Sequence, residues 1–406
     1  MSDYFDDLEI RSADQRAADL ASALPTQILN AKRNAPGYAV AFADVDPAEI
    51  KSLAALAKLP VLRKSDLGQA QVPGNPMGGF GTRGRFDQLF MSPGPIFEPG
   101  MRSKDWWRMG RVLYAAGLRA GDVAQNCFSY HLTPAGVMFD NACAAIGATV
   151  IPAGPGQTEM QVHAAHTLGS TAYIGTPDYL KIILDKADEL GITLDITKAA
   201  VGGGVLFPSL RQEYADRGIS CLQGYGTADL GNVAYESSVR EGMIVDEGVI
   251  VEIVTPGTGV PVADGAVGEV VVTTLNSDYP LIRFATGDLS AVMPGESPCG
   301  RTNTRIRGWM GRADQTAKIK GMFVRPEQVG DFVARHADVT KARIVITRAG
   351  EVDHMAVLVE TSGTPNVATL EASVKETLKL HGPVHLRNTG DLPDDGKVID
   401  DQRSYD

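Results

Sequence analysis

Four short stretches of the sequence contain side chains that could act on a small ligand. Gln223–Gly231 (QGYGTADLG) carries an aromatic ring, a hydroxyl and the carboxylate of Asp229, and Tyr279–Asp288 (YPLIRFATGD) ends in a second carboxylate. Arg305–Gln328 is basic and interrupted by glycines, and Leu392–Lys397 (LPDDGK) ends in a lysine. Carboxylates accept hydrogen bonds or bind hard cations, and a lysine neutralises negative charge. Local basic groups of this kind could hold a phosphorylated small molecule.

The Arg305–Gln328 stretch has the pattern of a hinge between two regions. Gly311 and Gly321 permit backbone turns that a side chain would obstruct, and Pro326-Glu327 opens an apolar-periodic segment that predicts a helix. A surface loop on one large domain would show the same local pattern. The regions on either side therefore have to decide between the two interpretations.

Strand-like and helical patterns alternate between Trp106 and Gln223, after a first helix predicted over Ser12–Asn34. The predicted helices lie at Trp106–Ala116, Pro134–Ile146, Glu159–Leu168, Tyr179–Leu190 and after Pro208, and the predicted strands lie at Val123–Phe128, Ala148–Ile151, Ala172–Ile174, Ala199–Val201 and Ile219–Gln223. This alternation is typical of a largely parallel sheet covered on both faces. In such sheets ligands bind at the carboxyl ends of the strands.

The helical patterns stop after Met243. Strand-like runs at Gly248–Val254, Gly268–Thr274 and Leu281–Phe284, separated by Pro and Gly turns, favour an antiparallel region in the form of a distorted β-barrel. Beyond this region the pattern is that of a small α+β unit. We therefore predict an α/β protein with a large N-terminal domain over residues 1–313 and a small C-terminal domain over residues 314–406.

Composition narrows the class of partner. The chain has 406 residues and a formal net charge of −11, which argues against nonspecific binding of nucleic acid or of an anionic membrane. No apolar run approaches a membrane span, and the acidic N-terminus lacks the pattern of a secretory signal, so we expect a cytoplasmic protein. The four cysteines have no metal-ligand spacing, and we expect isolated thiols.

In order and spacing, the four stretches resemble the phenylacetate-CoA ligase family of the adenylate-forming acyl-CoA ligases. The N-terminal segments YFDDLEIRSADQR and LPVLRKSDL resemble that family too, so the resemblance covers nearly the whole chain. It implies ATP, Mg²⁺ and coenzyme A as cofactors, an aromatic carboxylate as substrate, and a small C-terminal domain that moves. The implied reaction forms acyl-AMP and pyrophosphate, after which coenzyme A attacks the acyl carbon and AMP leaves. Whether the protein forms a homodimer is left open.

The resemblance assigns nucleotide contacts to particular residues. Asp288 would accept hydrogen bonds from both ribose hydroxyls, Arg312 would support the same ribose, and the ring of Tyr225 would stack on adenine. The remaining predicted nucleotide contacts are Ser92, Gly203, Gly204, Gly226 and Thr227. Simpler interpretations are a turn aspartate for Asp288 and a solvated surface arginine for Arg312.

The resemblance also assigns the catalytic groups. Asp229 would position Mg²⁺ against the phosphates of ATP, although the family more often has Glu there, so the ion could be held through water. Lys397 would neutralise charge on the carboxylate and the α-phosphate during adenylation. Asp314 would be the hinge about which the small domain rotates to withdraw Lys397. An exposed lysine on a polar tail is the alternative interpretation of Lys397.

The acyl pocket is expected among aromatic side chains near predicted strand ends. Tyr130, His131 and Phe139 are the candidates, with Tyr173 beside them, and a family preference for aromatic acids makes such a lining reasonable. Each of these residues is also an ordinary core residue type.

The sequence departs from the family in the phosphate-binding loop. Family members carry a Ser/Thr/Gly-rich loop whose amides and hydroxyls bind the β- and γ-phosphates. The corresponding segment here, Met91–Pro99, has three prolines without N–H groups, keeps one hydroxyl at Ser92, and places Glu98 where its charge would repel phosphate. We therefore expect weakened ATP binding through this loop. Metal ligands for the structural zinc of some relatives are missing as well, and we predict no zinc.

Three hypotheses follow. The first is an ATP- and Mg²⁺-dependent acyl-CoA ligase for an aromatic carboxylate such as phenylacetate. The second is a degenerate relative that binds a nucleotide, acyl-CoA or acyl-adenylate without full turnover. The third is an adenylating enzyme that passes the acyl group to an acceptor other than coenzyme A.

Overall fold

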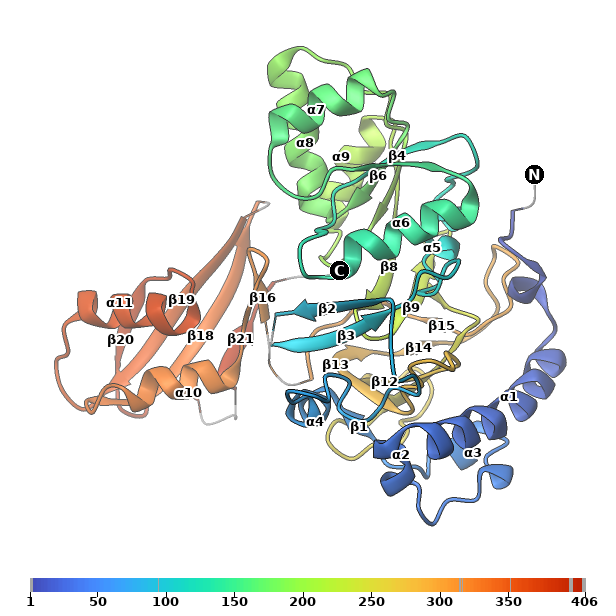
Figure 1. The fold of residues 1–406 in the computed structure, drawn as a ribbon. Helices are drawn as coiled ribbons and strands as arrows, with labels where there is room; N and C mark the ends of the chain where they lie inside the picture. Colours follow the sequence, from blue (N-terminus) through green and yellow to red (C-terminus); the bar gives the residue numbers. More distant parts are fainter. Residues whose placement is uncertain are drawn as a thin grey trace. The chain divides into compact units, whose positions relative to one another are not determined.

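The computed structural model describes residues 3–93, 95–313, 315, 317–350, 352–393 and 397–403 (Figure 1). The chain divides into two compact units, Met1–Met310 and Gly311–Asp406. The predicted hinge residue Asp314 lies outside the described residues.

A nine-stranded sheet forms the centre of the first unit, with the order β14-β15-β10-β9-β8-β7-β6-β4-β5. The strands at one end of this sheet are parallel, as predicted: β4 (Val123–Asn126), β5 (Thr149–Pro152), β6 (Ala172–Gly175), β7 (Lys198–Val201) and the start of β8 (Ser220–Thr227). The helices that alternate with them are α5 (Gly110–Ala115), α6 (Ala135–Ile146), α7 (Thr158–Thr167), α8 (Pro177–Leu190) and α9 (Pro208–Asp216).

Glycine and proline set the ends of these helices. Proline occupies the first turn of α8 and α9, where its missing N–H costs no helical hydrogen bond. Gly147 and Gly191 follow the last residues of α6 and α8 with φ of 78° and 64°, in the left-handed region that glycine enters without a Cβ clash. The helices therefore end where the sequence predicts.

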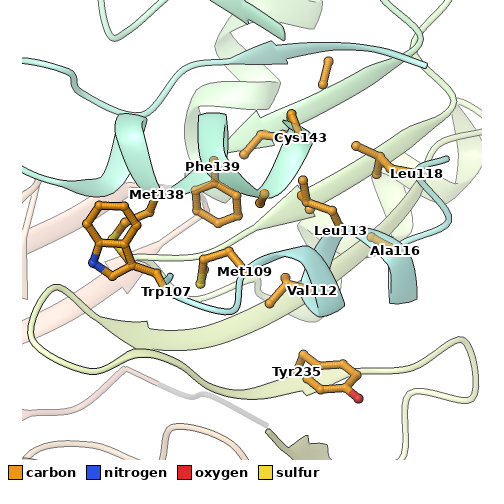
Figure 2. Close-up of a cluster of buried hydrophobic side chains, with 14 of the residues drawn as sticks. Trp107, Met109, Val112, Leu113, Ala116, Leu118, Met138, Phe139, Cys143 and Tyr235 are labelled. Atoms are coloured by element: carbon orange, nitrogen blue, oxygen red, sulfur yellow. The ribbon is translucent and has the colours of Figure 1, made fainter. Parts of the chain in front are cut away.

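Apolar side chains pack α5 and α6 against the sheet (Figure 2). Trp107, only 1% exposed, lies against Phe90, while Leu113 of α5 and Phe139 of α6 fill the layer beside Ala124 of β4. Burying a large side chain of this kind stabilises the fold by roughly 1.5–3 kcal/mol. This layer fixes the carboxyl ends of the parallel strands relative to the helices that follow them.

Strand β8 changes partner along its length. Its first half pairs with β7 in parallel as far as Gln223, and from Gly224 onward it pairs antiparallel with β9 (Gly231–Glu236). The antiparallel side of the sheet continues through β10 (Met243–Val245), β15 (Arg305–Ile306) and β14 (Val292–Met293). The QGYGTADLG stretch thus lies where the sheet changes from parallel to antiparallel pairing.

The predicted β-barrel is an open sheet. Four strands, β1 (Leu62–Arg63), β13 (Phe284–Ser290), β12 (Gly268–Thr274) and β11 (Val249–Val254), pair in the order β1-β13-β12-β11, and the described residues do not close this sheet on itself. Strand β13 begins at Phe284, whereas the prediction ended a strand there. Asp288 therefore lies inside a strand and not after one, because the apolar run Leu281–Phe284 was mistaken for the strand itself.

The segment expected as a phosphate-binding loop is a β-hairpin. β2 (Gln88–Ser92) and β3 (Ile96–Gly100) pair antiparallel around Pro93 and Pro95. Gln71, at the end of α4 (Lys64–Ala70), donates to the carbonyl of Phe97 and accepts from its N–H, at 2.6 and 2.9 Å. These two bonds tie α4 to β3. Strand β3 falls in the segment Met91–Pro99, which was expected to be a loop.

The N-terminal segment covers part of the first unit. Its helices are η1 (Asp7–Ile10), α1 (Ala13–Asn34), α2 (Pro36–Ala41), η2 (Pro47–Glu49) and α3 (Leu53–Leu56). Leu24 and Ile28 of α1 are fully buried against Ile250 and Ile282, so α1 packs on the four-stranded sheet.

The second unit is a small α+β fold. Its strands are β16 (Ala317–Ile319), β17 (Met322–Val324), β18 (Val339–Ala349), β19 (Val352–Thr361), β20 (Val384–Asn388) and β21 (Ile399–Asp401), and its helices are α10 (Pro326–Ala334) and α11 (Val367–Leu378). The last four strands pair as β20-β19-β18-β21, and Phe332 and Val374 of the helices share a core with them. Among the described residues of either unit, every helix is too short or too polar to span a bilayer.

Candidate active site

Asp288 is a buried carboxylate held from two sides. It lies on β13 with 8% of its surface exposed. The Tyr225 hydroxyl donates to its Oδ2 at 2.8 Å, and the Trp309 indole N–H donates to its Oδ1 at 3.0 Å. These two donors, from β8 and from the segment after β15, hold the Asp288 carboxylate in a fixed orientation.

Tyr225 connects the nine-stranded and four-stranded sheets of the first unit. It lies on the antiparallel half of β8, and its hydroxyl reaches Thr286 Oγ1 at 3.3 Å as well as Asp288 on β13. The ring is half-buried. An aromatic ring anchored through its hydroxyl presents a fixed flat surface, which suits stacking on a base.

A tight hairpin follows Tyr225. At Gly226 a Cβ would lie 2.6 Å from the carbonyl oxygen of Gly231, so only glycine allows the two backbones this approach. Thr227 Oγ1 accepts from the Leu230 N–H at 3.1 Å and so closes the turn that contains Asp229. The turn directs Asp229 inward.

Asp229 is buried, with 4% of its surface exposed, and its side chain forms an ion pair with Lys64 of α4. Lys64 Nζ donates to Oδ2 at 2.7 Å. The other oxygen, Oδ1, is buried and makes no hydrogen bond with any described residue. A buried anionic oxygen of this kind fits a hard cation such as Mg²⁺, so the residues present agree with the predicted metal role.

Glu98 lies on the buried face of β3 with no exposed surface. Neither of its carboxylate oxygens makes a hydrogen bond within the described part of the chain. Burial, and secondarily the charge of Asp229, raise the pKa of the Glu98 carboxyl to about 7, against smaller lowering effects of Ser92 and Lys64. Ser92 itself ends β2 and is half-buried.

The glycines after β7 lie at the carboxyl edge of the parallel strands. Gly203 has φ of 67° in the left-handed region, and a Cβ there would lie 3.6 Å from the ring of Phe128. A Cβ on Gly204 would lie 3.4 Å from the ring of Pro177. The turn therefore runs beside the segment that follows β4.

The predicted acyl-pocket residues follow β4 at the same edge. Phe139 is buried and stacks on Phe128, with ring centroids 4.9 Å apart. The Tyr130 hydroxyl donates to Asp140 Oδ1 at 2.6 Å, and the His131 side chain is exposed. Phe128, which neighbours Gly203, thus connects Phe139 to the glycine turn. Their role in binding an acyl group stays a prediction.

Comparison with known proteins identifies relatives that match most of the chain. No family model matches the sequence. It is 29% identical over 380 residues to the phenylacetate-coenzyme A ligase of Aromatoleum evansii, covering 89% of this chain and 85% of that protein. It is also 28% identical over 419 residues to the phenylacetate-coenzyme A ligase of Escherichia coli, covering 96% and 94%. The chain is a homologue of the phenylacetate-CoA ligases. The resemblance stated from the sequence motifs is confirmed.

A solved structure gives the same fold. The 2-hydroxyisobutyryl-CoA ligase in complex with 2-HIB-AMP and CoA, in its thioesterification state, matches 100% of this chain and 93% of its own with a TM-score of 0.83 and 22% identity. The α/β architecture of a phenylacetate-CoA ligase homologue, with parallel and antiparallel sheets, is therefore confirmed.

Two of the predicted site residues, Lys397 and Arg312, lie in the second unit. Lys397 is exposed, and its Nζ lies 3.4 Å from Asp400 Oδ1. The Gln315 side chain accepts from the Val398 N–H at 2.7 Å, which ties the segment of Lys397 to the start of this unit. Arg312 is half-buried near that start. The roles of Lys397 and Arg312 stay predictions.

Sequence reasoning missed two contributors to the site. Lys64 lies in the LPVLRKSDL stretch and Trp309 in the Arg305–Gln328 stretch, but neither was given a role. The LPVLRKSDL match to the phenylacetate-CoA ligase family was the signal that could have found Lys64. Nothing local connects Trp309 to Asp288, because that contact joins separate elements.

Proposed function

We propose that the protein is an AMP-forming acyl-CoA ligase that joins an aromatic carboxylate such as phenylacetate to coenzyme A through acyl-AMP. Homology to phenylacetate-CoA ligases over most of the chain supports this activity. The structural observation that carries it is Asp288, a buried carboxylate that the Tyr225 hydroxyl and the Trp309 indole hold in one orientation. The predicted cytoplasmic location and the open question of a homodimer belong to the same proposal.

In this proposal the first unit binds the nucleotide. The Asp288 oxygens accept from the two ribose hydroxyls, since an ionised carboxylate held by fixed donors is a strong and well-oriented acceptor. The anchored ring of Tyr225 stacks on adenine, and Arg312 supports the ribose. The glycine turn at Gly203 and Gly204 lets the ligand approach the backbone, where a Cβ would intrude.

Asp229 orients the phosphate end. Mg²⁺, when bound, supplies positive charge that neutralises the phosphates during adenylation. Asp229 Oδ1 is the oxygen available to hold it, because Lys64 occupies Oδ2. Lys64 also keeps the buried Asp229 carboxylate partly neutralised when the site is unloaded.

Lys397 supplies the mobile positive charge. Its side chain is exposed, so it can approach an anion without first breaking a buried ion pair. During adenylation it neutralises charge that develops between the carboxylate and the α-phosphate, and movement of the second unit then withdraws it before coenzyme A attacks.

Pyrophosphate release tests the proposal. Purified protein is incubated with ATP, Mg²⁺ and a panel of aryl carboxylates, with and without coenzyme A, and pyrophosphate and thioester are measured. We expect both products with at least one arylacetic acid. If no acid of the panel gives pyrophosphate while AMP or acyl-AMP still raises the melting temperature, the protein is a binder and the ligase proposal fails.

Replacing Lys397 tests the two half-reactions separately. We expect Lys397→Ala to abolish pyrophosphate release, because no other charge replaces it in the adenylation step, while thioester formation from supplied acyl-AMP stays within a few-fold of the parent. Lys375→Ala, which removes another exposed lysine of the second unit, is the matched control and should leave both steps unchanged. Equal pyrophosphate release by Lys397→Ala and the parent would refute the role.

A binding function without turnover is the second candidate. The hairpin that takes the place of the phosphate-binding loop offers prolines at its turn and a buried carboxylate at Glu98. Neither donates a hydrogen bond to a β- or γ-phosphate in its ordinary form. Release of pyrophosphate without thioester, in the presence of coenzyme A, would instead favour a different acyl acceptor.

A further inference from the structure

Arg108 has an unusual backbone conformation between the buried Trp107 and α5. Its φ of 61° lies in the left-handed region, which residues other than glycine enter rarely and at a cost in free energy. Such a conformation persists only where surrounding contacts hold it, and residues of this kind cluster at functional sites. The contacts of the Arg108 side chain therefore indicate what the conformation serves.

The Arg108 guanidinium binds the hairpin turn that contains Asp229. Its Nη2 donates to the Leu230 carbonyl at 2.6 Å and to the Asn232 carbonyl at 3.1 Å. The Leu230 N–H is already bonded to Thr227 Oγ1 at 3.1 Å. Both polar backbone groups of the residue after Asp229 are therefore held, one by the turn itself and one by Arg108.

A buried carboxylate anchors the guanidinium. Arg108 Nε donates to Asp246 Oδ1 at 2.8 Å, and Asn232 Nδ2 donates to Asp246 Oδ2 at 3.1 Å. Asp246 has no exposed surface, and charge-assisted hydrogen bonds to it are stronger than neutral ones. A Cβ on Gly248 would lie against Arg108 Cδ and 2.8 Å from its Nε, so only glycine admits the arginine side chain here. The anchor and this glycine fix where the guanidinium lies.

We propose that Arg108 is a positioning residue for Asp229. It fixes the peptide that follows Asp229, while Lys64 holds the Asp229 side chain at 2.7 Å. Without Arg108 the turn loses two hydrogen bonds, and a misplacement of about 1 Å at a reacting group costs up to about 100-fold in rate. The inference rests on the proposed function through the role of Asp229 in adenylation, but the state of the turn is measurable without substrates.

Hydrogen exchange of the full chain without ligands measures the turn directly. In Arg108→Ala we expect amide exchange in residues 227–232 to be about tenfold faster than in the parent, because the bonds from Arg108 are lost. Gly248→Ala should have the same effect, since its Cβ displaces the Arg108 side chain and removes no charged group.

Arg119→Ala provides the matched control. Arg119 is also half-buried and donates to two backbone carbonyls, those of Tyr114 and Leu118, at 2.6 and 2.8 Å. It lies after α5 in a turn without a predicted site residue. Its replacement should leave exchange in residues 227–232 and both half-reactions as in the parent.

The two half-reactions separate positioning from stability alone. For Arg108→Ala we expect kcat for pyrophosphate release to fall by about 10–100-fold, with thioester formation from supplied acyl-AMP within about threefold of the parent. A smaller folded fraction would lower both equally. Unchanged exchange in the turn, pyrophosphate release equal to that of the parent, or an equal loss in both half-reactions overturns the inference. If the parent releases no pyrophosphate while exchange in the turn still rises in Arg108→Ala, only the ligase function fails.

Discussion

Two buried carboxylates of the first unit, Asp288 and Glu98, have opposite surroundings. Asp288 accepts hydrogen bonds from Tyr225 and Trp309, whereas Glu98 receives none from the described residues. A carboxylate with fixed donors is held ready for a ligand at little cost. A buried carboxylate without donors must take a proton or a cation, because an isolated buried charge is unstable. Asp288 is therefore a preformed binding group, whereas the charge state of Glu98 depends on pH and on the cations present.

Removing Asp288 should have the largest effect. In Asp288→Ala the ribose loses two charge-assisted acceptors and two protein donors lose their partner, so we expect kcat/KM for pyrophosphate release to fall by about 10²–10⁴-fold, roughly 3–6 kcal/mol. Asp278→Ala is the control, since Asp278 also accepts from an indole, that of Trp106 at 3.1 Å, but has no predicted ligand contact. If kcat/KM fell less than tenfold in Asp288→Ala, or fell equally in Asp278→Ala, Asp288 would not be the preformed binding group that we describe.

Replacing Glu98 should change the pH dependence of stability. The pKa of Glu98 is raised to about 7 from an ordinary 4.5, so between these values the folded chain keeps a proton that the unfolded chain releases. Its stabilising contribution is complete below pH 4.5 and is lost as the pH rises through 7, a cost of roughly 3 kcal/mol. Glu98→Gln cannot ionise and should escape this loss.

Chemical denaturation with EDTA present measures this difference. We expect the free energy of unfolding of Glu98→Gln to match that of the parent at pH 4.5 and to exceed it by about 3 kcal/mol at pH 8. A difference that stays constant over this range would mean that Glu98 titrates normally, and the contrast with Asp288 would then be one of hydrogen bonding only.

Removing the Tyr225 hydroxyl should have the smallest effect. Tyr225→Phe keeps the ring that stacks and loses the hydrogen bonds of the hydroxyl to Asp288 and Thr286, so we expect AMP affinity, measured by calorimetry, to fall about tenfold, or ~1.4 kcal/mol. Tyr179→Phe removes a hydroxyl bonded to the Gly156 carbonyl at 2.9 Å and should leave AMP affinity unchanged. An unchanged affinity in Tyr225→Phe would show that Trp309 alone orients Asp288.

The local pattern of the sequence predicted most of the elements. Helices with glycine after their last residue, such as α6 and α8, were placed to within about two residues, because periodicity and end signals act over one or two turns. The β2–β3 hairpin was missed, because the family resemblance assigned a phosphate-binding loop to Met91–Pro99. The barrel was wrong because the pattern of a strand does not say whether the sheet that contains it closes.

The sequence by itself determined the alternating helices and strands, the four motifs and the resemblance that they carry. Only the tertiary structure decided which charged groups meet. Lys64 and Asp229 are 165 residues apart, and Tyr225 and Asp288 are 63 apart, yet each pair forms a hydrogen bond. Side-chain burial and long-range contacts depend on how sheets and helices pack, which no local pattern records. For that reason Glu98 read as a charge that repels phosphate, and the fold shows it fully buried on β3.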